Sequence, residues 1–422
     1  MANKSIFKTL VGIWTPRADT FNEAGGRAYE FTPEHALAQY AVTGSFNSTF
    51  YAGAEEQFEK VLELCAKVSP EFIAKLAVFA RERGHMKDMP AFLVAVLSVR
   101  DRELLARVFP RVVDNGKMLR NFVQIMRSGA VGRKSLGTMP KRLVREWFES
   151  RTAEAIFRQS VGQSPSFGDI LKMVHPKPAD AEFEALFGYL IGRKVELGKL
   201  PEVIRELELF KLGESDRVPD VPFQMLTALP LSANDWKAIA RNAGWTMTRM
   251  NINTFQRQGV FSDAELVKII ADRLRDANAI KRERVFPYQL LMAFKMAEAN
   301  REVPREVTEA LQDAMEIATA NVPAIDGKVY VLPDVSGSMS SPATGIRKGS
   351  TTAVRCIDVA GLTASAILRS NPTAEVIPFE CEVVDVKLNP RDSVMTNAAK
   401  LASVGGGGTN CSAPLRLLNR KK

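Results

Sequence analysis

Apolar residues recur at intervals of three and four positions along most of the chain, from about residue 54 to residue 320. The run EEQFEKVLELCAKV carries Phe58, Val61 and Leu62 at this spacing, which places them on one face of a helix. Residues 70–84 repeat the pattern between a proline and a glycine, which favour the start and the end of a helix. Similar runs follow with short connections. The pattern predicts paired helices that stack into an α-solenoid of the HEAT type.

A different pattern begins near residue 323, where short strand-like runs alternate with longer helical ones. Residues 329–332 form an apolar, β-branched and aromatic run that ends in a polar loop. Residues 351–370 and 391–404 have the character of helices. Between these helices lie two strand-like runs, AEVIPFE and EVVDVKL, which we expect to be strands of a hairpin. This alternation predicts a doubly wound α/β sheet.

These patterns divide the chain into three parts. Residues 1–53 are mixed in character, and we expect an N-terminal arm with little regular structure there. Residues 54–322 form the helical solenoid, and residues 323–422 form the α/β domain, with Pro and Gly marking the boundary. The expected fold class is therefore mainly α, a HEAT-like solenoid followed by a doubly wound domain.

Composition limits the class of protein. The chain has 422 residues, of which 46% are hydrophobic and 25% charged, as is usual for a soluble protein with two or three domains. We expect neither a membrane span nor a secretory signal, because no apolar run is long enough. The four cysteines lie far apart and the three histidines form no zinc pattern, so reduced thiols in a cytoplasmic protein are expected. The formal charge of +9 is compatible with a polyanionic partner.

The polar loop after residue 332 carries a pattern of oxygen donors. Asp334, Ser336 and Ser338 offer one carboxylate and two hydroxyls at the carboxyl end of a strand, where ligands gather in open α/β sheets. Thr409 adds a third hydroxyl after the glycine run 405–408, which lets the backbone approach an ion closely. Because Mg²⁺ prefers oxygen ligands, the pattern predicts a magnesium site. An Asp followed by Ser and Gly is also the composition of an ordinary turn.

A second candidate region lies in the helical part. Between residues 111 and 151 there are ten Lys and Arg residues and three Asp and Glu residues. Arg133, Lys134, Lys141 and Arg142 lie in or beside a glycine-flanked loop that would come close to a phosphate backbone. The alternative is that these charges lie on solvated outer faces of helices, with the neighbouring aromatic residues in the core.

The run FGDILKMVHPKP supplies another basic cluster. Lys172, His175 and Lys177 gather at a helix end, and Arg158 lies one helix earlier. A neutral histidine can stack on a base or donate to a phosphate. The same residues would also serve as a C-terminal cap with a favourable contact to the helix dipole. The run therefore indicates either an RNA contact or a helix end.

Taken in order, five runs resemble the Ro ribonucleoprotein family, whose members join an RNA-binding module of HEAT-like helices, the TROVE module, to a von Willebrand factor type A domain. The resemblance covers nearly the whole chain and rests on GRKSLGTMPKRLVREWF, DILKMVHPKP, WTMTRMNINTF, DVSGSMS and GGGGTNCSAP. In that family the helices form a ring closed by the type A half. Single-stranded 3′ ends of misfolded noncoding RNAs thread its hole, and a Y RNA binds outside. The family's RNA-contacting histidine falls on His175 and a basic position on Arg158, while another basic position falls on Gly162.

The resemblance also implies partners and a cofactor. A bacterial or phage-type member would work with Y-like RNA and with the exoribonuclease polynucleotide phosphorylase, and no membrane or DNA partner is expected. The oxygen-donor loop resembles the metal-ion-dependent adhesion site (MIDAS) of type A domains, in which Ser336, Ser338 and Thr409 would ligate Mg²⁺ and Asp334 would act mostly through water. Type A domains continue beyond the position of Thr409 with further strands and helices, so we expect a C-terminally truncated form.

We therefore predict a non-enzymatic RNA-binding protein that sequesters noncoding RNA or presents misfolded RNA for quality control. The alternative is a protein-interaction module in which Mg²⁺ recruits an acidic side chain of a partner. A metal-dependent nuclease is a third hypothesis, although the sequence shows no Ser/His/Asp arrangement and no base beside the hydroxyls of the polar loop.

Overall fold

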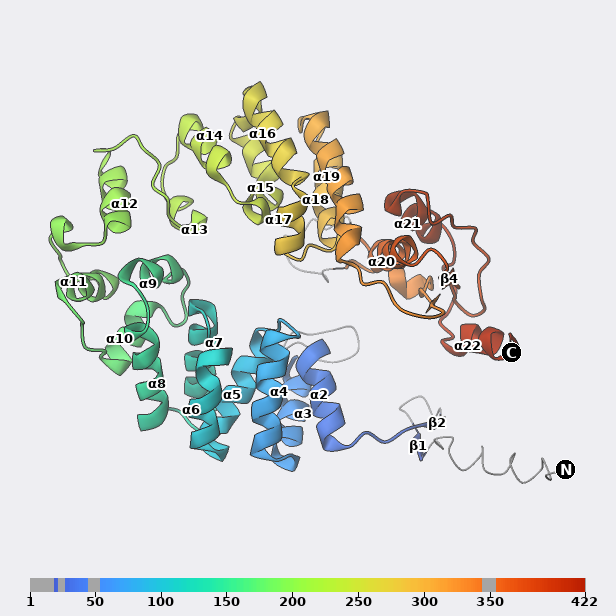
Figure 1. Cartoon of the computed structure of the whole chain (residues 1–422), viewed down its shortest axis with the longest axis horizontal. Helices are drawn as coiled ribbons and strands as arrows, with labels where there is room; N and C mark the ends of the chain where they lie inside the picture. Colours follow the sequence, from blue (N-terminus) through green and yellow to red (C-terminus); the bar gives the residue numbers. More distant parts are fainter. Residues whose placement is uncertain (1–18, 22–26, 45–53, 344–353, 422) are drawn as a thin grey trace. The chain divides into compact units, whose positions relative to one another are not determined.

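The structure of the chain is a computed structural model. The residues that it describes are 19–21, 27–44, 54–343 and 354–421. The chain groups into two compact units, Met1–Leu229 (unit 1) and Pro230–Lys422 (unit 2). No helix among the described residues is both long and apolar enough to cross a membrane. Helices dominate both units (Figure 1), so the prediction of a mainly α fold is confirmed.

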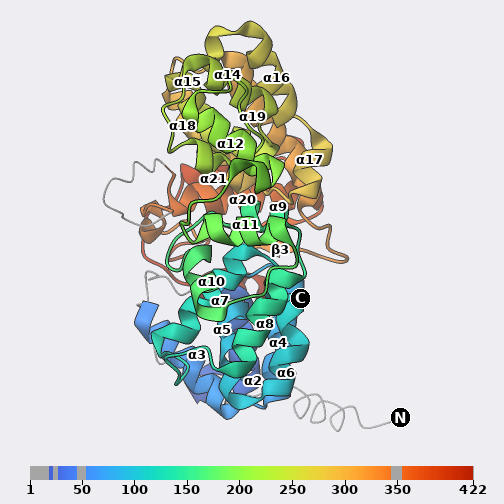
Figure 2. The same cartoon turned by 90° about the vertical axis from the view of Figure 1, so that its left-hand side faces the viewer.

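Unit 1 is a succession of helices, preceded by two short antiparallel strands. Its elements are β1 (Thr20–Phe21), β2 (Arg27–Ala28), α2 (Pro33–Thr43), α3 (Ala54–Lys67), α4 (Pro70–Glu82), α5 (Asp88–Arg100), α6 (Arg102–Val112), α7 (Gly116–Ser128), α8 (Thr138–Glu149), α9 (Ala153–Gln159), α10 (Phe167–Val174), α11 (Ala181–Leu190), η1 (Leu197–Lys199), α12 (Glu202–Leu212) and α13 (Phe223–Leu226). Neighbouring helices lie side by side in two orthogonal views (Figures 1 and 2).

Helix α5 forms the centre of the first part of unit 1. It is apolar on all sides, and residues from Met89 to Ser98 are buried. It contacts α4, α6 and α7, which explains why it needs no polar face. Helix α4 begins where the sequence predicts, with the Ser69 hydroxyl accepting a hydrogen bond from the Phe72 N–H and proline at the first turn. Phe79 on this helix is 52% exposed.

The expectation of little regular structure in residues 1–53 is wrong for one stretch. Helix α2 forms there and packs against α3 and α4. Its start is set by Thr32, whose side chain accepts from the His35 N–H, and by Pro33 in the first turn. Leu37 and Ala41 lie one turn apart and are buried. The helix has only this narrow apolar stripe, which is a weak signal in the sequence.

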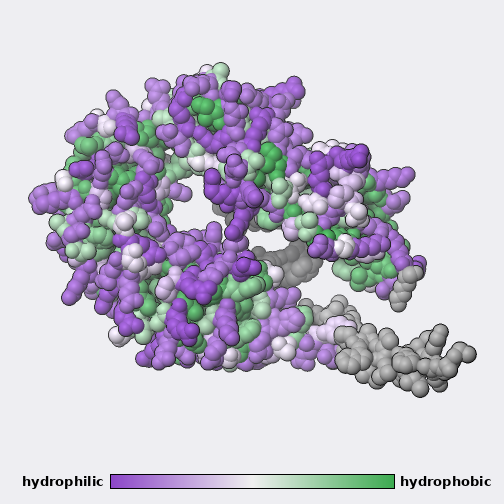
Figure 3. Space-filling view, viewed as in Figure 1, coloured by the Kyte–Doolittle hydropathy of each residue, from purple (hydrophilic) through white to green (hydrophobic). Residues whose placement is uncertain are grey.

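Unit 2 joins the last helices of the array to an α/β part. Its elements are α14 (Ala233–Asn242), α15 (Trp245–Arg257), η2 (Val260–Ser262), α16 (Ala264–Leu274), α17 (Ala277–Arg282), α18 (Pro287–Ala299), α19 (Arg305–Ala318), η3 (Thr319–Asn321), β3 (Tyr330–Val331), η4 (Gly337–Ser340), α20 (Cys356–Ser370), β4 (Glu375–Val376), α21 (Val394–Ala402) and α22 (Ser412–Arg420). In Figure 3 the visible surface is mostly hydrophilic, with smaller hydrophobic patches among the hydrophilic residues.

The α/β part is built on two parallel strands. Tyr330 pairs with Glu375 in β3 and β4, and the pairing continues as a parallel bridge between Asp334 and Phe379. Helices α20 and α21 pack closely against each other. The predicted strand EVVDVKL forms no strand among the described residues, where it contributes one antiparallel bridge from Val383 to Phe379. A short segment with no further neighbour has too few ladder hydrogen bonds to extend as a strand.

The change from helices to strands falls between η3 and β3, as the sequence indicates, but the compact units divide earlier, between Leu229 and Pro230. Contacts within unit 2 explain this. Helix α20 packs on α18, and Glu316 of α19 accepts from the Val394 N–H at the start of α21. The α/β part therefore shares its packing with α14–α19. The boundary at residue 323 stays a prediction.

Candidate nucleic-acid interface and metal site

The loop from α7 to α8 makes a basic hollow in unit 1. Its volume is about 420 Å³ and its lining is Ser135, Gly137, Thr138, Lys141, Arg142 and Arg145. Gly137 precedes the first turn of α8, and no side chain caps that turn. The N–H groups of the first turn and the positive end of the helix dipole therefore face the hollow together with three cations. This combination suits a phosphate group.

The spacing of α8 explains how three cations reach one hollow. Thr138, Lys141, Arg142 and Arg145 follow one another at intervals of three, one and three residues, which places them on one helix face. Lys141 and Arg142 were predicted from the sequence, whereas Arg145 was not. The same spacing was the signal that would have identified it. Arg142 also lies 3.4 Å from Glu146, an exposed pair that a phosphate would compete with readily.

The other two predicted cations of the loop lie beside glycines. The guanidinium of Arg133 lies against Gly137, so close that a Cβ on the glycine would be 2.7 Å from its Nη1. The stem of Lys134 lies along Gly129, which ends α7 in the left-handed conformation. Lys134 is exposed and Arg133 is half-buried. The structure thus places Arg133, Lys141 and Arg142 at the start of α8, whereas Lys134 lies beside the end of α7.

Arg145 connects this hollow to the second predicted cluster. Its Nε donates a hydrogen bond to the Val174 carbonyl at the end of α10, and α8 contacts α10. His175 follows directly as the C-cap of α10, with its N–H donating to the Leu171 carbonyl at 2.9 Å. The hollow and the end of α10 are therefore parts of one surface, which we call the α8–α10 surface.

His175 has an unusual backbone conformation. Its φ of 49° and ψ of 63° lie in the left-handed region, where glycine is the usual residue at a helix end. Histidine is tolerated there better than most residues, yet the conformation still costs about 1 kcal/mol or more. The side chain is exposed. The predicted helix cap is thus present, and the imidazole extends from it into solvent.

Lys172 and Lys177 stand on either side of His175 and are exposed. The pKa of the Asp169 carboxyl is lowered, chiefly by hydrogen bonds from the Ser166 side chain and N–H and further by the charges of Lys172 and Arg127. Asp169 closes the capping box that begins α10. The Asp169 carboxylate therefore stabilises the start of α10, and Lys172 in the last turn of α10 remains available for a ligand.

Arg158 differs from the other predicted contacts. Its guanidinium bonds to Glu154 at 2.7 Å and to Asp220 at 3.0 Å. Both carboxylates are more than half exposed, so they balance its charge without burying it. An RNA phosphate would have to displace them. The role of Arg158 stays a prediction.

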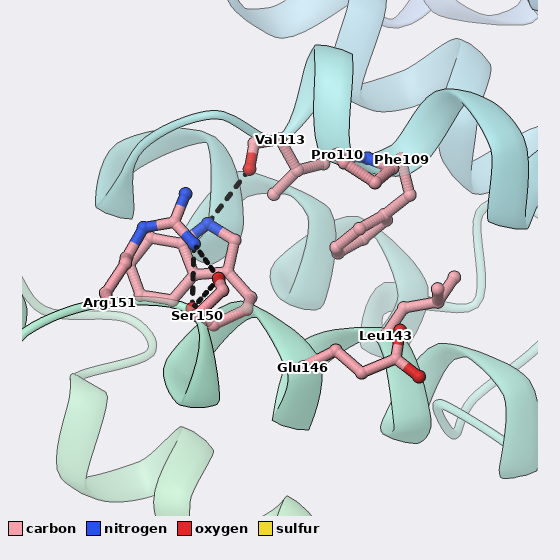
Figure 4. Close-up of a pocket in the computed structure, with 8 residues that line it drawn as sticks. Phe109, Pro110, Val113, Leu143, Glu146, Ser150 and Arg151 are labelled. Atoms are coloured by element: carbon pink, nitrogen blue, oxygen red, sulfur yellow. Dashed lines mark hydrogen bonds between the residues drawn. The ribbon is translucent and has the colours of Figure 1, made fainter.

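Three bases of the cationic stretch have partners within the protein. Arg111 pairs with Glu82, and Arg120 lies over the Phe167 ring. Arg151 lies over the indole ring of Trp147, 3.8 Å from its centroid. Figure 4 shows Arg151 at the edge of a hollow of about 230 Å³ between α6 and α8. The Trp147 Nε1–H donates to the Val113 carbonyl, and the ring is 3% exposed. For these residues the alternative of structural packing is the better interpretation.

In unit 2, the four predicted metal ligands come together. The Thr409 hydroxyl donates to Ser336 Oγ at 2.8 Å, and Ser336 Oγ lies 3.2 Å from Ser338 Oγ. The Asp334 carboxylate accepts from the Ser336 N–H at 2.8 Å. One carboxylate and three hydroxyls thus meet at the end of the strand pair, the donor set that a hard divalent cation prefers. Among the described residues, no group of three or more His, Cys, Asp or Glu side chains offers a rival site.

Glycines make this meeting possible. Gly405 has a φ of +85°, and a Cβ there would lie 2.1 Å from the Val335 carbonyl oxygen. The two loops are joined by backbone hydrogen bonds from Gly406 N–H to Val335 and from Gly337 N–H to Gly407. Glu380 supports the same loop by accepting from the Gly407 N–H at 2.7 Å. Sequence reasoning missed Glu380, although it ends the strand-like run AEVIPFE.

Similarity to known proteins covers both parts of the chain. Residues 328–422 match a family model described as the Ro60 vWA domain, that is, a von Willebrand factor type A domain. The chain is 26% identical to the "RNA-binding protein RO60" of Deinococcus radiodurans, over 93% of this chain and 79% of that protein. The crystal structure of the D. radiodurans RO (RSR) protein has the same fold, with a TM-score of 0.71 and 23% identity over 92% of this chain and 84% of that one.

Proposed function

Because the chain belongs to the Ro protein family as a member of the bacterial kind, we propose that it binds noncoding RNA and that the α8–α10 surface is one of its contacts. The observation that carries this assignment is the basic hollow at the uncapped start of α8, joined through Arg145 to the helix end that presents His175. The similar protein of D. radiodurans is named an RNA-binding protein, which agrees with it.

Each part of the α8–α10 surface has a distinct task in this proposal. Lys141, Arg142 and the first N–H groups of α8 bind a phosphate, and released counterions supply salt-dependent affinity. His175, held out by its left-handed backbone, stacks on an unpaired base or donates to a phosphate. A glycine would cap α10 with less strain, so the imidazole itself is the reason for a histidine at this position.

The finer assignment concerns the kind of RNA. We propose that a structured, Y-like RNA binds the α8–α10 surface and that single-stranded 3′ ends of misfolded RNA bind elsewhere on the helices. Phosphate contacts on helix ends read shape and backbone rather than sequence, which suits a ligand with many sequence variants. Polynucleotide phosphorylase is the proposed protein partner in RNA quality control. The proposal includes no catalytic step by this chain.

Salt titration of RNA binding tests the proposal. Fluorescence anisotropy with a labelled Y-like RNA should show affinity that falls steeply between 50 and 200 mM salt, by about 0.9 in log–log slope per phosphate contact. The double variant Lys141→Ala/Arg142→Ala should lower that slope by about two. A matched control, Lys67→Ala/Arg111→Ala, removes two charges from exposed ion pairs of the same unit and should leave the slope unchanged. Equal slopes for the two variants would refute the assignment.

A second pair of variants separates the two kinds of RNA. Lys172→Ala combined with His175→Ala should weaken binding of the Y-like RNA more than binding of a single-stranded tail. The substitution His175→Gly keeps the left-handed cap and removes only the imidazole. It should therefore also weaken binding of the Y-like RNA more than binding of the tail, without loss of helix stability. Equal effects on both RNAs would place the single-stranded tail on the same surface.

The hydroxyl cluster of unit 2 supports a second proposal. Ser336, Ser338 and Thr409 would hold Mg²⁺, with Asp334 as the charged member of the set. Bound Mg²⁺ would supply a Lewis-acidic position for a carboxylate of a protein partner. If so, Mg²⁺ should raise the melting temperature, EDTA should reverse the rise, and Ser338→Ala should abolish it while RNA binding stays unchanged. No Mg²⁺-dependent shift in the wild-type protein would contradict the metal site.

A further inference from the structure

The turn between α17 and α18 in unit 2 exposes two aromatic rings that no structural role accounts for. Phe286 is 39% exposed and Tyr288 is 46% exposed. The rings stack on each other, with centroids 6.4 Å apart and planes 22° apart. Aromatic rings contribute to stability by leaving water, yet more than a third of each of these residues remains exposed to it. An exposed apolar cluster of this kind usually marks a place where something binds.

The turn that carries the rings is held firmly. Asn321 donates from its side chain to the carbonyls of Ile280 and Val285, at 3.1 and 2.8 Å. Val285 is buried, and the Phe286 N–H is capped by the Gln289 side chain at 2.9 Å. Pro287 follows Phe286 and restricts it to the extended backbone observed, with φ −99° and ψ 150°. The rings are therefore presented by a fixed support.

Three cations precede the aromatic pair in the sequence. Lys281, Arg282 and Arg284 are exposed and precede the rings in the run KRERVFPY. Within the described part of the chain, neither Lys281 nor Arg282 forms an ion pair, and the single acid of the run, Glu283, accepts a hydrogen bond from Thr246. The local charge is thus positive beside an apolar, planar surface.

We propose that Phe286 and Tyr288 form a stacking platform for unpaired bases of single-stranded RNA, with Lys281 and Arg282 binding the phosphates beside them. Proteins that bind single strands without sequence preference combine a positive groove with exposed aromatic rings, because every base has a π-face. An apolar peptide partner would contact the rings but would leave Lys281 and Arg282 without counter-charges. This inference rests on the proposed RNA binding and adds a second contact, in unit 2, for the single-stranded part of the ligand.

A short oligonucleotide containing 2-aminopurine tests the platform in the full-length protein. Stacking quenches the fluorescence of the base analogue, so the wild-type protein should quench it on binding. The variant Phe286→Ala/Tyr288→Ala should weaken binding at least about tenfold and abolish the quenching. Tyr288→Phe keeps a ring and should bind like wild type. Phe79→Ala is the matched control, since Phe79 is an aromatic residue of unit 1 that is 52% exposed.

The salt dependence distinguishes rings from cations. Lys281→Ala/Arg282→Ala should lower the log–log salt slope by about 1.4, that is about 0.7 for each contact to a single strand, and leave quenching at low salt intact. If Phe286→Ala/Tyr288→Ala binds and quenches like wild type, the platform is wrong, and an apolar protein partner becomes the occupant to seek. If no wild-type RNA binding is found at all, the proposed function itself fails. If binding of the Y-like RNA depends on Lys141 and Arg142 while the ring variant leaves oligonucleotide binding unchanged, the proposed function stands and only the platform is removed.

Discussion

Replacing Gly405 by alanine should open the loop junction that gathers the hydroxyl cluster. The added Cβ would lie 2.1 Å from the Val335 carbonyl oxygen, so the two loops would have to move apart by an ångström or so. That movement breaks the backbone hydrogen bonds from Gly406 to Val335, at 2.9 Å, and from Gly337 to Gly407, at 2.8 Å. At about 0.5–1.5 kcal/mol each, their loss lowers the free energy of local opening by about 1–3 kcal/mol.

The neighbouring glycine provides a matched control. Gly406 also has a positive φ, +111°, but a Cβ there would meet nothing within 4 Å. Gly406→Ala therefore carries the backbone strain of an L residue at positive φ, roughly 1–3 kcal/mol, without the collision. The difference between the two variants isolates the close approach of the loops.

Hydrogen exchange followed by mass spectrometry measures this difference directly. Peptides that cover residues 335–338 and 405–409 should exchange about 5- to 150-fold faster in Gly405→Ala than in Gly406→Ala, the factor that corresponds to about 1–3 kcal/mol. Unit 1 peptides should not change and serve as an internal reference. Equal exchange in the two variants would show that the loops do not meet as the structure describes, and the hydroxyl cluster would lose its support.

Three further predictions concern thiols, pH and packing. Cys381 and Cys411 are exposed and should react with iodoacetamide in the native protein, whereas burial raises the pKa of the Cys65 thiol to about 12, and Cys65 should react only after unfolding. Hydrogen bonds within its capping box hold the pKa of Asp169 below 3.8, so its contribution to stability is complete above pH 3.8 and is lost as pH falls through the lower folded-state pKa. The stability difference between wild type and Asp169→Ala should therefore shrink in acid, and a constant difference would contradict this. Arg151→Ala removes two hydrogen bonds to backbone carbonyls and a stacking contact at 3.8 Å, and denaturant unfolding should show a loss of about 2–4 kcal/mol that Arg151→Lys does not restore.

Helix positions could be predicted from the sequence because they depend on local spacing. Helices α3 and α4 form where local patterns predict them. These patterns are the apolar stripe of Phe58, Val61 and Leu62 and the N-cap before Pro70, and each spans only a few residues. Helix α2 was missed, since its apolar stripe is short and its packing against α3 and α4 supplies the rest of its stability. The strand expected at EVVDVKL failed for the opposite reason. Its local composition favours a strand, but among the described residues its bridge pairing is limited to Val383 with Phe379.

The candidate sites also combine features that the sequence predicts with features that depend on tertiary packing. The meeting of Ser336 with Thr409 could be predicted from residue types, because Mg²⁺ prefers oxygen ligands and ligands gather at the carboxyl ends of strands. The ion pair of Arg158 with Asp220 joins residues 62 positions apart, and nothing in the sequence indicates it. The hydrogen bond from Arg145 to Val174, which makes one surface of two basic clusters, is also a product of tertiary packing.

Mapping of cross-links between the protein and a Y-like RNA tests the proposed RNA interface most directly. After ultraviolet irradiation of the complex and digestion, cross-linked peptides should concentrate in residues 133–145 and 172–177, because the hollow at the start of α8 and the end of α10 lie on one surface. Lys141→Ala/Arg142→Ala should reduce the yield at both places together. Cross-links that avoid both segments, or a yield at 172–177 that ignores changes at α8, would contradict the α8–α10 surface as the place where the RNA binds.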